Sequence, residues 1–454
     1  MFDLLVIGSG PGGYRAAILA AQRGLSVAIA EKDEWGGACL NRGCVPKKAW
    51  YSTARLAAAA PGFAERGLRG TLEPDLAAAW RYQRKIVESV RASYADYLVR
   101  LKIACLHGPA KFVDRERVTI GTEAIGAGCF VVATGSRPVL PQSLRELPRV
   151  LTTDELFEQP LPSGRRVALL GSGAVGVEMA FILPRLGLEV VWLTGSEALA
   201  RSRFSSSARK HLHKALSAHG VTPRVKSRPL RAALEGQQVL LELPGGAQER
   251  VDWVLAGTGR RPNTDALGLQ FAGVQTDRHG FIAVDPAQRT SAGRIYAIGD
   301  CANPIMTANH ALAEASVAVA DIVAPGSAQT RGDWVPEVVY SALELARSGA
   351  TEDELEDADT EYAVGFSAFG ANPAALAEGS AEGYVRLLVE HEQGSLLGCE
   401  FAGADAGELI HLAQPGVAGG ALLAQVRFAH PSRSEEFLNA AEALVASWGV
   451  APAR

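Results

Sequence analysis

The stretch Asp3–Arg23, DLLVIGSGPGGYRAAILAAQR, decides the fold. It opens with an apolar run of strand length and closes with the alanine-rich, helix-like segment Tyr14–Arg23. Between them lies G-x-G-x-x-G, with Gly8, Gly10 and Gly13 at the motif positions. Glycines here permit a tight turn, let the backbone approach a pyrophosphate, and let the helix pack closely on the strand. The amides at the start of the helix then hold the phosphates, so the stretch predicts a dinucleotide-binding unit.

A carboxylate completes this first pattern. The next predicted strand, Ser26–Ala30, ends at Glu31, which lies 18 residues after Gly13. A carboxylate at that point can accept hydrogen bonds from both hydroxyls of a ribose. The glycine motif alone is a weak signal, but the strand, the helix and Glu31 together indicate dinucleotide binding.

The same pattern occurs a second time. The predicted strand Arg166–Leu170 precedes Gly171, Gly173 and Gly176 at the motif positions, and a helix-like and a strand-like segment follow. Each unit is followed by a similar short motif, Ala133–Pro138 (ATGSRP) after the first and Gly257–Pro262 (GTGRRP) after the second. A third motif, Ile295–Asp300 (IYAIGD), would place an aspartate at a strand end. The repetition predicts two dinucleotides bound by one chain.

The composition excludes several classes of protein. A chain of 454 residues predicts two to four domains. With 21% charged residues, a net charge of −4 and no Lys/Arg run, we expect no nucleic-acid partner. No signal peptide and no bilayer-spanning apolar segment is expected.

Two cysteines, Cys39 and Cys44, lie five positions apart in Gly36–Lys48, GGACLNRGCVPKK. Six cysteines in a chain of this length do not form a secreted disulfide framework, which predicts a cytoplasmic protein. No metal site is expected, because no second ligand pair and no histidine lies near the pair in the sequence. Pro46 suits the first turn of a helix, whose positive end would favour a Cys44 thiolate. The remaining cysteines are expected to be small core hydrophobes: Cys105, Cys129, Cys301 and Cys399.

Together with HPSRSEE near the C-terminus, these motifs resemble the class I pyridine nucleotide–disulfide oxidoreductases, a family that includes dihydrolipoamide dehydrogenases and glutathione reductases. The resemblance runs along essentially the whole chain. It implies an α/β fold with two Rossmann-like domains and a C-terminal α+β dimerisation domain. The implied boundaries are 1–143 and 267–330 for the two parts of the FAD-binding domain, 144–266 for the NAD(P)-binding domain, and 331–454 for the interface domain of a homodimer.

The resemblance also assigns catalytic roles. It makes Cys39 the thiol that exchanges with substrate and Cys44 the cysteine next to the flavin, so the pair is interpreted as redox-active. It makes His430 the acid/base, oriented by Glu435 and supplied by the partner subunit. An imidazole suits proton transfer near neutral pH, and a carboxylate stabilises its charged form. Ser432 and Glu435 also fit a capping box, which is compatible with this role.

FAD is assigned to the first unit and a nicotinamide dinucleotide to the second. Lys48 is expected near the flavin, paired with Glu178, although a solvated helix face is the alternative for Lys48. The cofactor-binding residues predicted for the first unit are Gly8, Gly10, Gly12, Gly13, Glu31, Lys32, Gly37, Lys48, Ala110, Thr134, Gly135, Ser136, Asp300 and Ala308. Those predicted for the second are Gly171, Gly173, Gly176, Glu178, Thr194, Arg201 and Gly259.

The choice between NAD and NADP stays open at this stage. In the first unit, Glu31 lies 18 residues after the last glycine of the motif. The residue 18 positions after Gly176 is Thr194, so the carboxylate typical of NAD enzymes is missing from the second unit. Arg201 and Arg203 are close enough in sequence to meet a 2′-phosphate. Against this, Gly176 replaces the alanine typical of NADP-using glutathione reductases. NAD is favoured, with NADP as the alternative.

The substrate signals are mixed. GSGPGGYRAAILAAQRG and AHPSRSEEFLNAAEAL resemble dihydrolipoamide dehydrogenases, whereas GCVPKK and WRYQRK resemble glutathione reductases. The tail lacks the extra cysteine pair of mercuric reductases. A lipoyl substrate, on a carrier protein or free, is therefore favoured over glutathione disulfide. A flavoprotein that mainly docks on a carrier or senses redox state is the alternative of another class, because Arg15 departs from the small apolar residue usual at its position.

Overall fold

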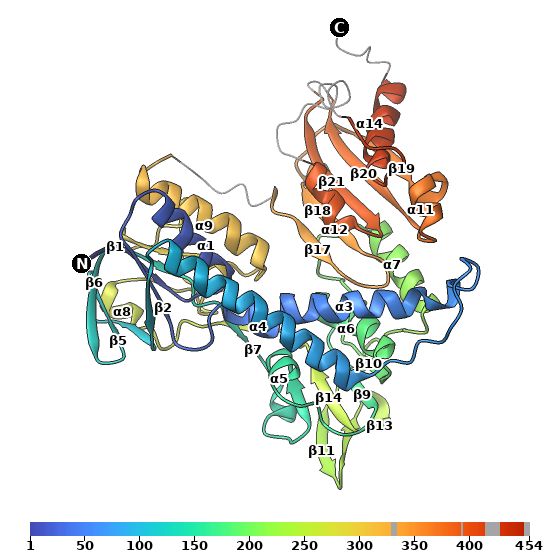
Figure 1. Cartoon of the computed structure of the whole chain (residues 1–454), viewed down its shortest axis with the longest axis horizontal. Coiled ribbons are helices and arrows are strands. Elements are labelled where there is room, and N and C mark those ends of the chain that lie inside the picture. The colour runs from blue at the N-terminus through green and yellow to red at the C-terminus, as the bar shows by residue number, and fades with distance from the viewer. Residues whose placement is uncertain (328–333, 392–393, 414–426, 449–454) are drawn as a thin grey trace. The chain divides into compact units, whose positions relative to one another are not determined.

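The computed structural model describes residues 1–327, 334–391, 394–413 and 427–448, the last four of these as backbone only (Figure 1). The chain forms two compact units. Unit one contains Met1–Trp50, Leu76–Ser163 and Thr258–Gly332, and unit two contains Tyr51–Asp75, Gly164–Gly257 and Asp333–Arg454. Within the described residues, no helix combines the length and the apolar character needed to cross a bilayer.

Unit one is built on a sheet whose strand order is β3-β2-β1-β6-β5-β4, with β16 also pairing with β6. The strands β1, β2, β3, β6 and β16 run parallel, and β4 and β5 form an antiparallel extension. Their bounds are β1 Phe2–Ile7, β2 Val27–Glu31, β3 Ala104–His107, β4 Ala110–Phe112, β5 Arg117–Ile120, β6 Glu123–Val132 and β16 Ile295–Ala297. Two short strands, β7 Ser136–Pro138 and β15 Arg260–Pro262, form a separate antiparallel pair, and β8 spans Val150–Thr152.

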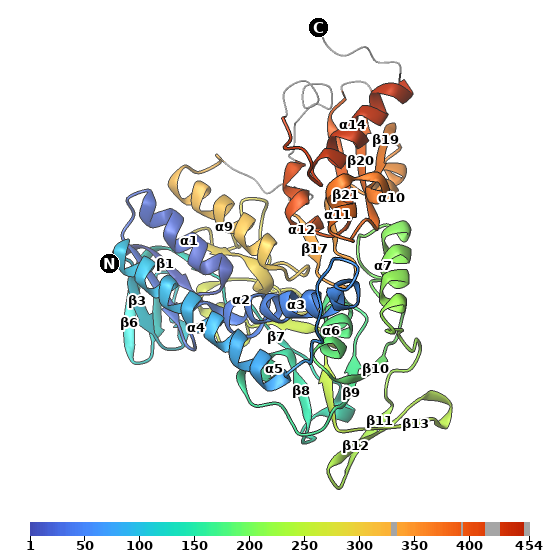
Figure 2. The ribbon, with the colours of Figure 1, turned by 45° about the vertical axis from the view of Figure 1, so that its right-hand side comes forward.

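Both faces of this sheet are buried, which explains why its strands are almost continuously apolar. Side chains alternate between the faces: Leu4 and Val6 join one core cluster, whereas Leu5 and Ile7 join the other. Helix α1 lies beside α9 on the first of these faces, as both Figure 1 and Figure 2 show. The helices of unit one are α1 Pro11–Gln22, α2 Gly37–Arg42, α4 Leu76–Arg100, α5 Thr153–Glu158, α8 Leu269–Ala272 and α9 Ala308–Val323. Helix α3 Cys44–Ala59 begins in unit one and continues into unit two.

Unit two contains a second parallel sheet and two antiparallel ones. Strand β9 Arg166–Leu170 lies between β10 Glu189–Leu193 and β14 Trp253–Ala256. Helix α6 Ala174–Arg185 follows β9, and α7 Ser206–Ala218 follows β10. A three-stranded meander contains β11 Arg231–Glu235, β12 Gln238–Glu242 and β13 Gln248–Val251.

The C-terminal part of unit two is a five-stranded antiparallel sheet with the order β17-β18-β21-β20-β19. Helix α14 Glu435–Trp448 packs on β19 and β20 (Figure 2). The other bounds are β17 Glu337–Val339, β18 Leu345–Gly349, β19 Tyr362–Ala368, β20 Gly383–Glu390, β21 Leu396–Gly403, α10 Glu352–Asp357, α11 Pro373–Ala377 and α12 Ala406–Leu409.

The elements predicted around the two glycine motifs are confirmed, with shifts of a few residues at their ends. The first predicted helix, Tyr14–Arg23, begins earlier, because Pro11 enters at the first turn of α1. The α/β class and the C-terminal α+β portion are also confirmed. The four-way division of the chain at residues 143, 266 and 330 stays a prediction.

The close approach of α1 to β1 gives a test of the fold. A Cβ on Gly13 would lie 1.9 Å from the Gly8 carbonyl oxygen, whereas a Cβ on Gly62 would meet nothing within 4 Å. Gly13→Ala is therefore expected to destabilise the protein by about 1–3 kcal/mol, the range for overpacking. Thermal unfolding of the two alanine variants measures the difference, with Gly62→Ala as the control. Equal melting temperatures for Gly13→Ala and the parent would contradict this packing.

Candidate active site

The first dinucleotide turn has the shape that a pyrophosphate requires. Gly8 has φ +103°, and Gly13 lies against the Gly8 carbonyl, so these glycines hold the helix against the strand. A Cβ on Gly12 would contact Ala311 of α9 at 3.2 Å. At Gly10, by contrast, a Cβ would meet nothing within 4 Å, and no side chain caps the start of α1. The N-terminal end of α1 is thus open for a phosphate group, which fits FAD at this site.

Glu31 is fixed beside this turn. It is the last residue of β2 and only 8% exposed. Its Oε2 accepts hydrogen bonds from the Ser9 amide at 2.8 Å and the Ser9 hydroxyl at 2.7 Å, and its Oε1 accepts from the Lys32 amide at 2.9 Å. Ser9, the serine within the glycine motif, therefore positions the carboxylate expected at the ribose, a role that the glycine spacing did not indicate. The Lys32 side chain itself is exposed.

A second group of predicted residues gathers around Asp300, in the 3-10 turn Gly299–Cys301 after β16. The Ser136 hydroxyl donates to Asp300 at 2.5 Å and accepts from Arg260 Nε at 2.7 Å. Buried Glu314 on α9 accepts from the Gly299 amide at 2.6 Å, which holds this turn in place. Burial raises the pKa of Glu314.

The two similar motifs, ATGSRP and GTGRRP, contact each other directly. Strands β7 and β15 pair ATGSRP with GTGRRP, so that Ser136 lies opposite Pro262. The Thr134 hydroxyl donates to the Asn263 carbonyl at 2.8 Å, and Asn263 N–H donates to the Gly135 carbonyl at 2.9 Å. Gly259, placed in the nicotinamide set by the sequence, accepts from the Val139 amide in this same unit. These contacts hold the two motifs together within unit one.

The other residues predicted for the first unit occupy three places. Gly37 opens α2 with φ +62°, and a Cβ there would lie 2.7 Å from the Gly10 Cα. Ala308 is the first residue of α9, after the N-cap Thr307. Ala110 lies on β4, half-buried against the core. The close contact of Gly37 with Gly10 ties α2 to the dinucleotide turn.

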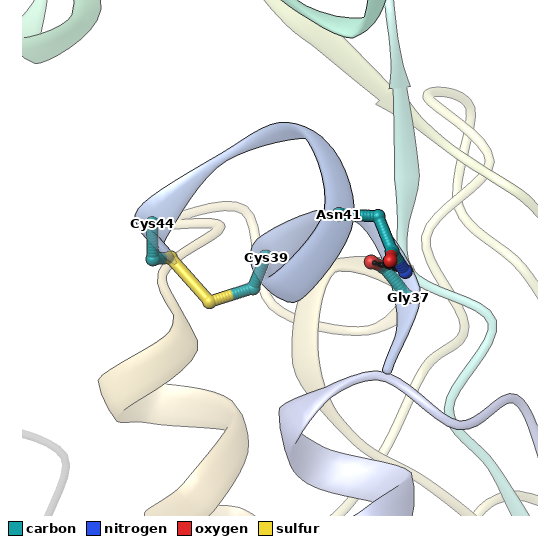
Figure 3. Close-up of a disulfide and its surroundings, with 4 residues drawn as sticks. All are labelled: Gly37, Cys39, Asn41 and Cys44. Carbon is teal, nitrogen blue, oxygen red and sulfur yellow. Dashed lines mark hydrogen bonds between the residues drawn. A yellow bond between two sulfur atoms is a disulfide. The ribbon is translucent and has the colours of Figure 1, made fainter. Parts of the chain in front are cut away.

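Cys39 and Cys44 form a disulfide, with their Cα atoms 4.8 Å apart (Figure 3). Cys39 lies on α2, and Cys44 is the first residue of α3, as expected from Pro46. Asn41, which lies between the two cysteines, is 1% exposed and donates from Nδ2 to the Gly37 carbonyl at 2.9 Å. The disulfide therefore bridges α2, which packs against the dinucleotide turn, to the positive N-terminal end of α3.

Arginines hold the helix that carries Cys39. Arg91 on α4 donates to Asn41 Oδ1 at 2.8 Å. Arg42 pairs with Asp33 at 2.6 Å and with Glu158 at 2.6 Å, and its hydrogen bond lowers the pKa of Asp33. The spacing of the sequence did not indicate the contacts made by Arg91 and Glu158, because both are distant from α2 along the chain.

Lys48 lies on α3 with its side chain exposed. Glu178 lies on α6 of unit two, is 3% exposed, and accepts from the Tyr340 amide at 3.0 Å. The pairing of Lys48 with Glu178 stays a prediction.

The second dinucleotide turn repeats the first. Gly171 has φ +125°, a Cβ on Gly176 would lie 2.2 Å from the Gly171 carbonyl oxygen, and a Cβ on Gly173 would meet nothing within 4 Å. This turn fits a second pyrophosphate. Thr194 follows β10 and is 1% exposed, with its amide donating to the Arg224 carbonyl at 3.0 Å.

The two arginines considered for a 2′-phosphate differ. The Arg203 guanidinium is engaged by Glu354 at 2.7 Å and by the Gly349 carbonyl at 3.3 Å. Arg201 is exposed. The Arg203 side chain is therefore already engaged by an ion pair within unit two, whereas Arg201 stays a candidate for the 2′-phosphate.

His430 and Glu435 form the predicted dyad. His430 Nδ1 lies 2.9 Å from Glu435 Oε1, and Glu435 Oε2 accepts from the Ser432 amide at 2.7 Å. The hydrogen bond from the Ser432 amide to the Glu435 side chain is one half of the capping box. The other oxygen of the same carboxylate contacts His430. These hydrogen bonds, led by that of His430, lower the pKa of Glu435. A carboxylate ionised at neutral pH can orient an imidazole ring through such a contact.

The prediction for the other cysteines needs one correction. Cys301 and Cys399 are buried and Cys129 is half-buried, but Cys105 is exposed. Cys105 lies on β3, the edge strand of its sheet, where alternate side chains point away from the core.

Comparisons with known proteins agree with this geometry. A family model described as pyridine nucleotide-disulphide oxidoreductase matches residues 2–315, and the dimerisation domain of the same family matches 335–441. The dihydrolipoyl dehydrogenase of Thermus scotoductus is 36% identical, with 98% of this chain and 97% of that protein covered. Dihydrolipoyl dehydrogenase 3 of Pseudomonas aeruginosa is 34% identical, with 97% of each covered.

The fold is also that of solved structures. LpdA of Mycobacterium tuberculosis superimposes with a TM-score of 0.89 at 23% identity, over 97% of this chain and 99% of that one. The HOCl-induced flavoprotein disulfide reductase RclA of Escherichia coli gives 0.83 at 23% identity, over 98% and 99%.

The cysteines give a prediction on reactivity. Burial raises the pKa of Cys301 to about 11 and that of Cys399 to about 12, so both remain protonated, unreactive thiols at pH 8. Iodoacetamide is expected to label Cys105 of the native oxidised protein and to leave both buried thiols unlabelled. After mild reduction, Cys39 and Cys44 are expected to be labelled as well. Peptide mass spectrometry reads the result, and rapid labelling of Cys301 or Cys399 in the native protein would contradict the packing.

Proposed function

Because the chain belongs to the pyridine nucleotide-disulphide oxidoreductase family, we propose that it is a dihydrolipoyl dehydrogenase that uses FAD and NAD. It would oxidise a dihydrolipoyl dithiol to the cyclic disulfide and reduce NAD⁺ to NADH with release of a proton. One observation carries the proposal: a disulfide at a helix start lies within the same unit as a dinucleotide turn. Full-length relatives named dihydrolipoyl dehydrogenase support the substrate.

The thiol chemistry follows from the cysteine pair. A substrate thiolate attacks Cys39 Sγ, the Cys39–Cys44 bond breaks, and Cys44 leaves as a thiolate. The second substrate thiol, deprotonated by His430, attacks the mixed disulfide and releases Cys39 while the lipoyl ring closes. Two electrons have then moved from the substrate to the cysteine pair. Bound FAD supplies the two-electron chemistry that links this dithiol to a hydride of NADH.

The start of α3 assists this step. Cys44, whose sulfur must leave as an anion, is the first residue of the helix and therefore lies at the end that carries the partial positive charge. A stabilised thiolate is a better leaving group, so attack at Cys39 is favoured over attack at Cys44. Cys44 is the more exposed of the two cysteines and would lie against the flavin.

The proton chemistry requires a second subunit. The chain carries the family's dimerisation domain, so it forms a homodimer, and we propose that each active site takes His430 and Glu435 from the other subunit. The dyad is well suited to this, because His430 is 74% exposed at its side chain while Glu435 is held by two hydrogen bonds. A lipoyl group on a carrier protein in a reducing cytoplasm is the proposed physiological substrate.

An assay on the purified flavoprotein tests the substrate. We expect NAD⁺ reduction with dihydrolipoamide and little or no reduction of glutathione disulfide by NADH or NADPH. A lipoylated carrier domain is included as a third substrate. Efficient turnover of glutathione disulfide with no lipoamide activity would overturn the proposal. Activity with the lipoylated carrier alone would identify an enzyme that requires its carrier.

Substitution of the dyad tests the acid/base role. His430→Ala is expected to lower kcat for dihydrolipoamide oxidation by about 10²–10⁴-fold, the usual contribution of general acid–base catalysis, without loss of FAD. Near-normal turnover in this variant would refute the role.

Glu435→Gln gives a finer test of the dyad. The amide can still contact His430 but carries no charge to stabilise an imidazolium, so kcat for dihydrolipoamide oxidation is expected to fall, though less than in His430→Ala. Glu442→Gln, an exposed position further along α14, is the matched control and is expected to leave kcat unchanged. A kcat equal to that of the parent protein in Glu435→Gln would show that the dyad does not function as a unit.

A further inference from the structure

The two dinucleotide units differ at the point where each would meet the adenosine ribose. In the first unit, the motif serine Ser9 hydrogen-bonds the Glu31 carboxylate at the end of the next strand. In the second unit the corresponding serine is Ser172, and its hydroxyl lies 3.0 Å from the hydroxyl of Ser196. A hydroxyl therefore replaces the carboxylate at the matching contact.

Thr194, which lies as far after Gly176 as Glu31 lies after Gly13, does not supply a carboxylate acceptor for the ribose. Thr194 is 1% exposed, its amide donates to the Arg224 carbonyl at 3.0 Å, and its own carbonyl accepts from the Ser227 amide at 2.9 Å. The nearest acid along the chain, Glu197, lies 4.0 Å from His213 on α7. A ribose 2′-hydroxyl thus lacks the fixed carboxylate found in the first unit.

A cation lies at this end of β10 instead. A Cβ on Gly195 would lie 3.0 Å from one terminal nitrogen of Arg228 and 3.3 Å from its guanidinium carbon. The planar guanidinium therefore covers the backbone between Thr194 and Ser196. Arg228 is exposed, and within the described ranges no ion pair or side-chain hydrogen bond engages it. Its neighbour Arg224, by contrast, is paired with Glu249.

Gly195 is what allows this arrangement. A larger residue would push the guanidinium away from the backbone, because even a Cβ at this position would lie closer to Arg228 than ordinary van der Waals contact. Exposed Arg201 follows on the same connection between β10 and α7. The connection thus carries the Ser196 hydroxyl and the Arg201 guanidinium, and Arg228, which follows α7 in the sequence, lies against it at Gly195. Hydroxyl and guanidinium donors suit a phosphate dianion.

From these contacts we propose that the adenosine end of the nicotinamide site also binds a 2′-phosphate, so that the protein accepts NADP(H) in addition to NAD(H). Arg228 is the specificity-determining residue, and Ser196 and Arg201 assist it. The proposal concerns the second dinucleotide site and does not depend on which disulfide is the substrate.

Adenosine nucleotides test this site without any turnover. Binding of 2′,5′-ADP and of 5′-AMP, which differ only by the 2′-phosphate, to the FAD-loaded protein is measured by isothermal titration calorimetry. We expect 2′,5′-ADP to bind at least about tenfold more tightly than 5′-AMP, since a charge-assisted hydrogen bond is worth about one to two powers of ten in affinity. Arg228→Ala is expected to remove that preference and leave 5′-AMP affinity unchanged. Arg231→Ala, an exposed arginine on β11, is the matched control.

A second variant tests the contact from the opposite direction. Ser196→Glu places a carboxylate next to Ser172, as Glu31 lies next to Ser9, and is expected to weaken 2′,5′-ADP binding while 5′-AMP binding is kept or improved. Equal affinities of the parent protein for the two nucleotides would overturn the proposal. An unchanged preference in Arg228→Ala would overturn the role of that residue. These binding readouts stay informative even if dihydrolipoamide proves not to be a substrate.

Discussion

The structure depends on a backbone contact too close for any side chain. In unit one α1 begins so near the end of β1 that only glycine fits at Gly13, and in unit two α6 approaches β9 in the same way at Gly176. Each contact brings the helix amides to the strand end and leaves one glycine, Gly10 or Gly173, open toward solvent. The same constraint explains why Gly176 is not an alanine: the methyl group would meet the Gly171 carbonyl, whichever nicotinamide cofactor is bound.

Around this contact the redox pair acquires its position. Gly37 rests on Gly10, so the helix that carries Cys39 is tied to the turn expected to hold FAD. Arg91 of α4 holds that helix through its hydrogen bond to Asn41, and the disulfide joins the helix to the start of α3. A cysteine pair with this spacing could in principle be structural. What distinguishes this one is its location at a helix N-terminus beside a dinucleotide turn, where a thiolate is stabilised.

The local features could be predicted from the sequence because their partners are close in the chain. The glycine motifs, the strands beside them, the helix that starts at Cys44 and the contact of His430 with Glu435 all involve short spacings. The long-range contacts could not be predicted. The pairing of β7 with β15, the ion pairs of Arg203 and the cover of Gly195 by Arg228 join segments far apart in sequence. The exposure of Cys105 was missed for the same reason, since only the strand order shows that β3 is an edge.

In the proposed mechanism, electrons pass from a dithiol through Cys39 and Cys44. Anaerobic titration of the purified flavoprotein with dihydrolipoamide, with thiols counted at each step, measures this transfer. We expect the first equivalent of dithiol to be consumed stoichiometrically, to produce two new protein thiols at these positions, and not to be consumed by Cys39→Ser. Reduction of the flavin by dihydrolipoamide in Cys39→Ser at the rate of the parent protein would contradict it.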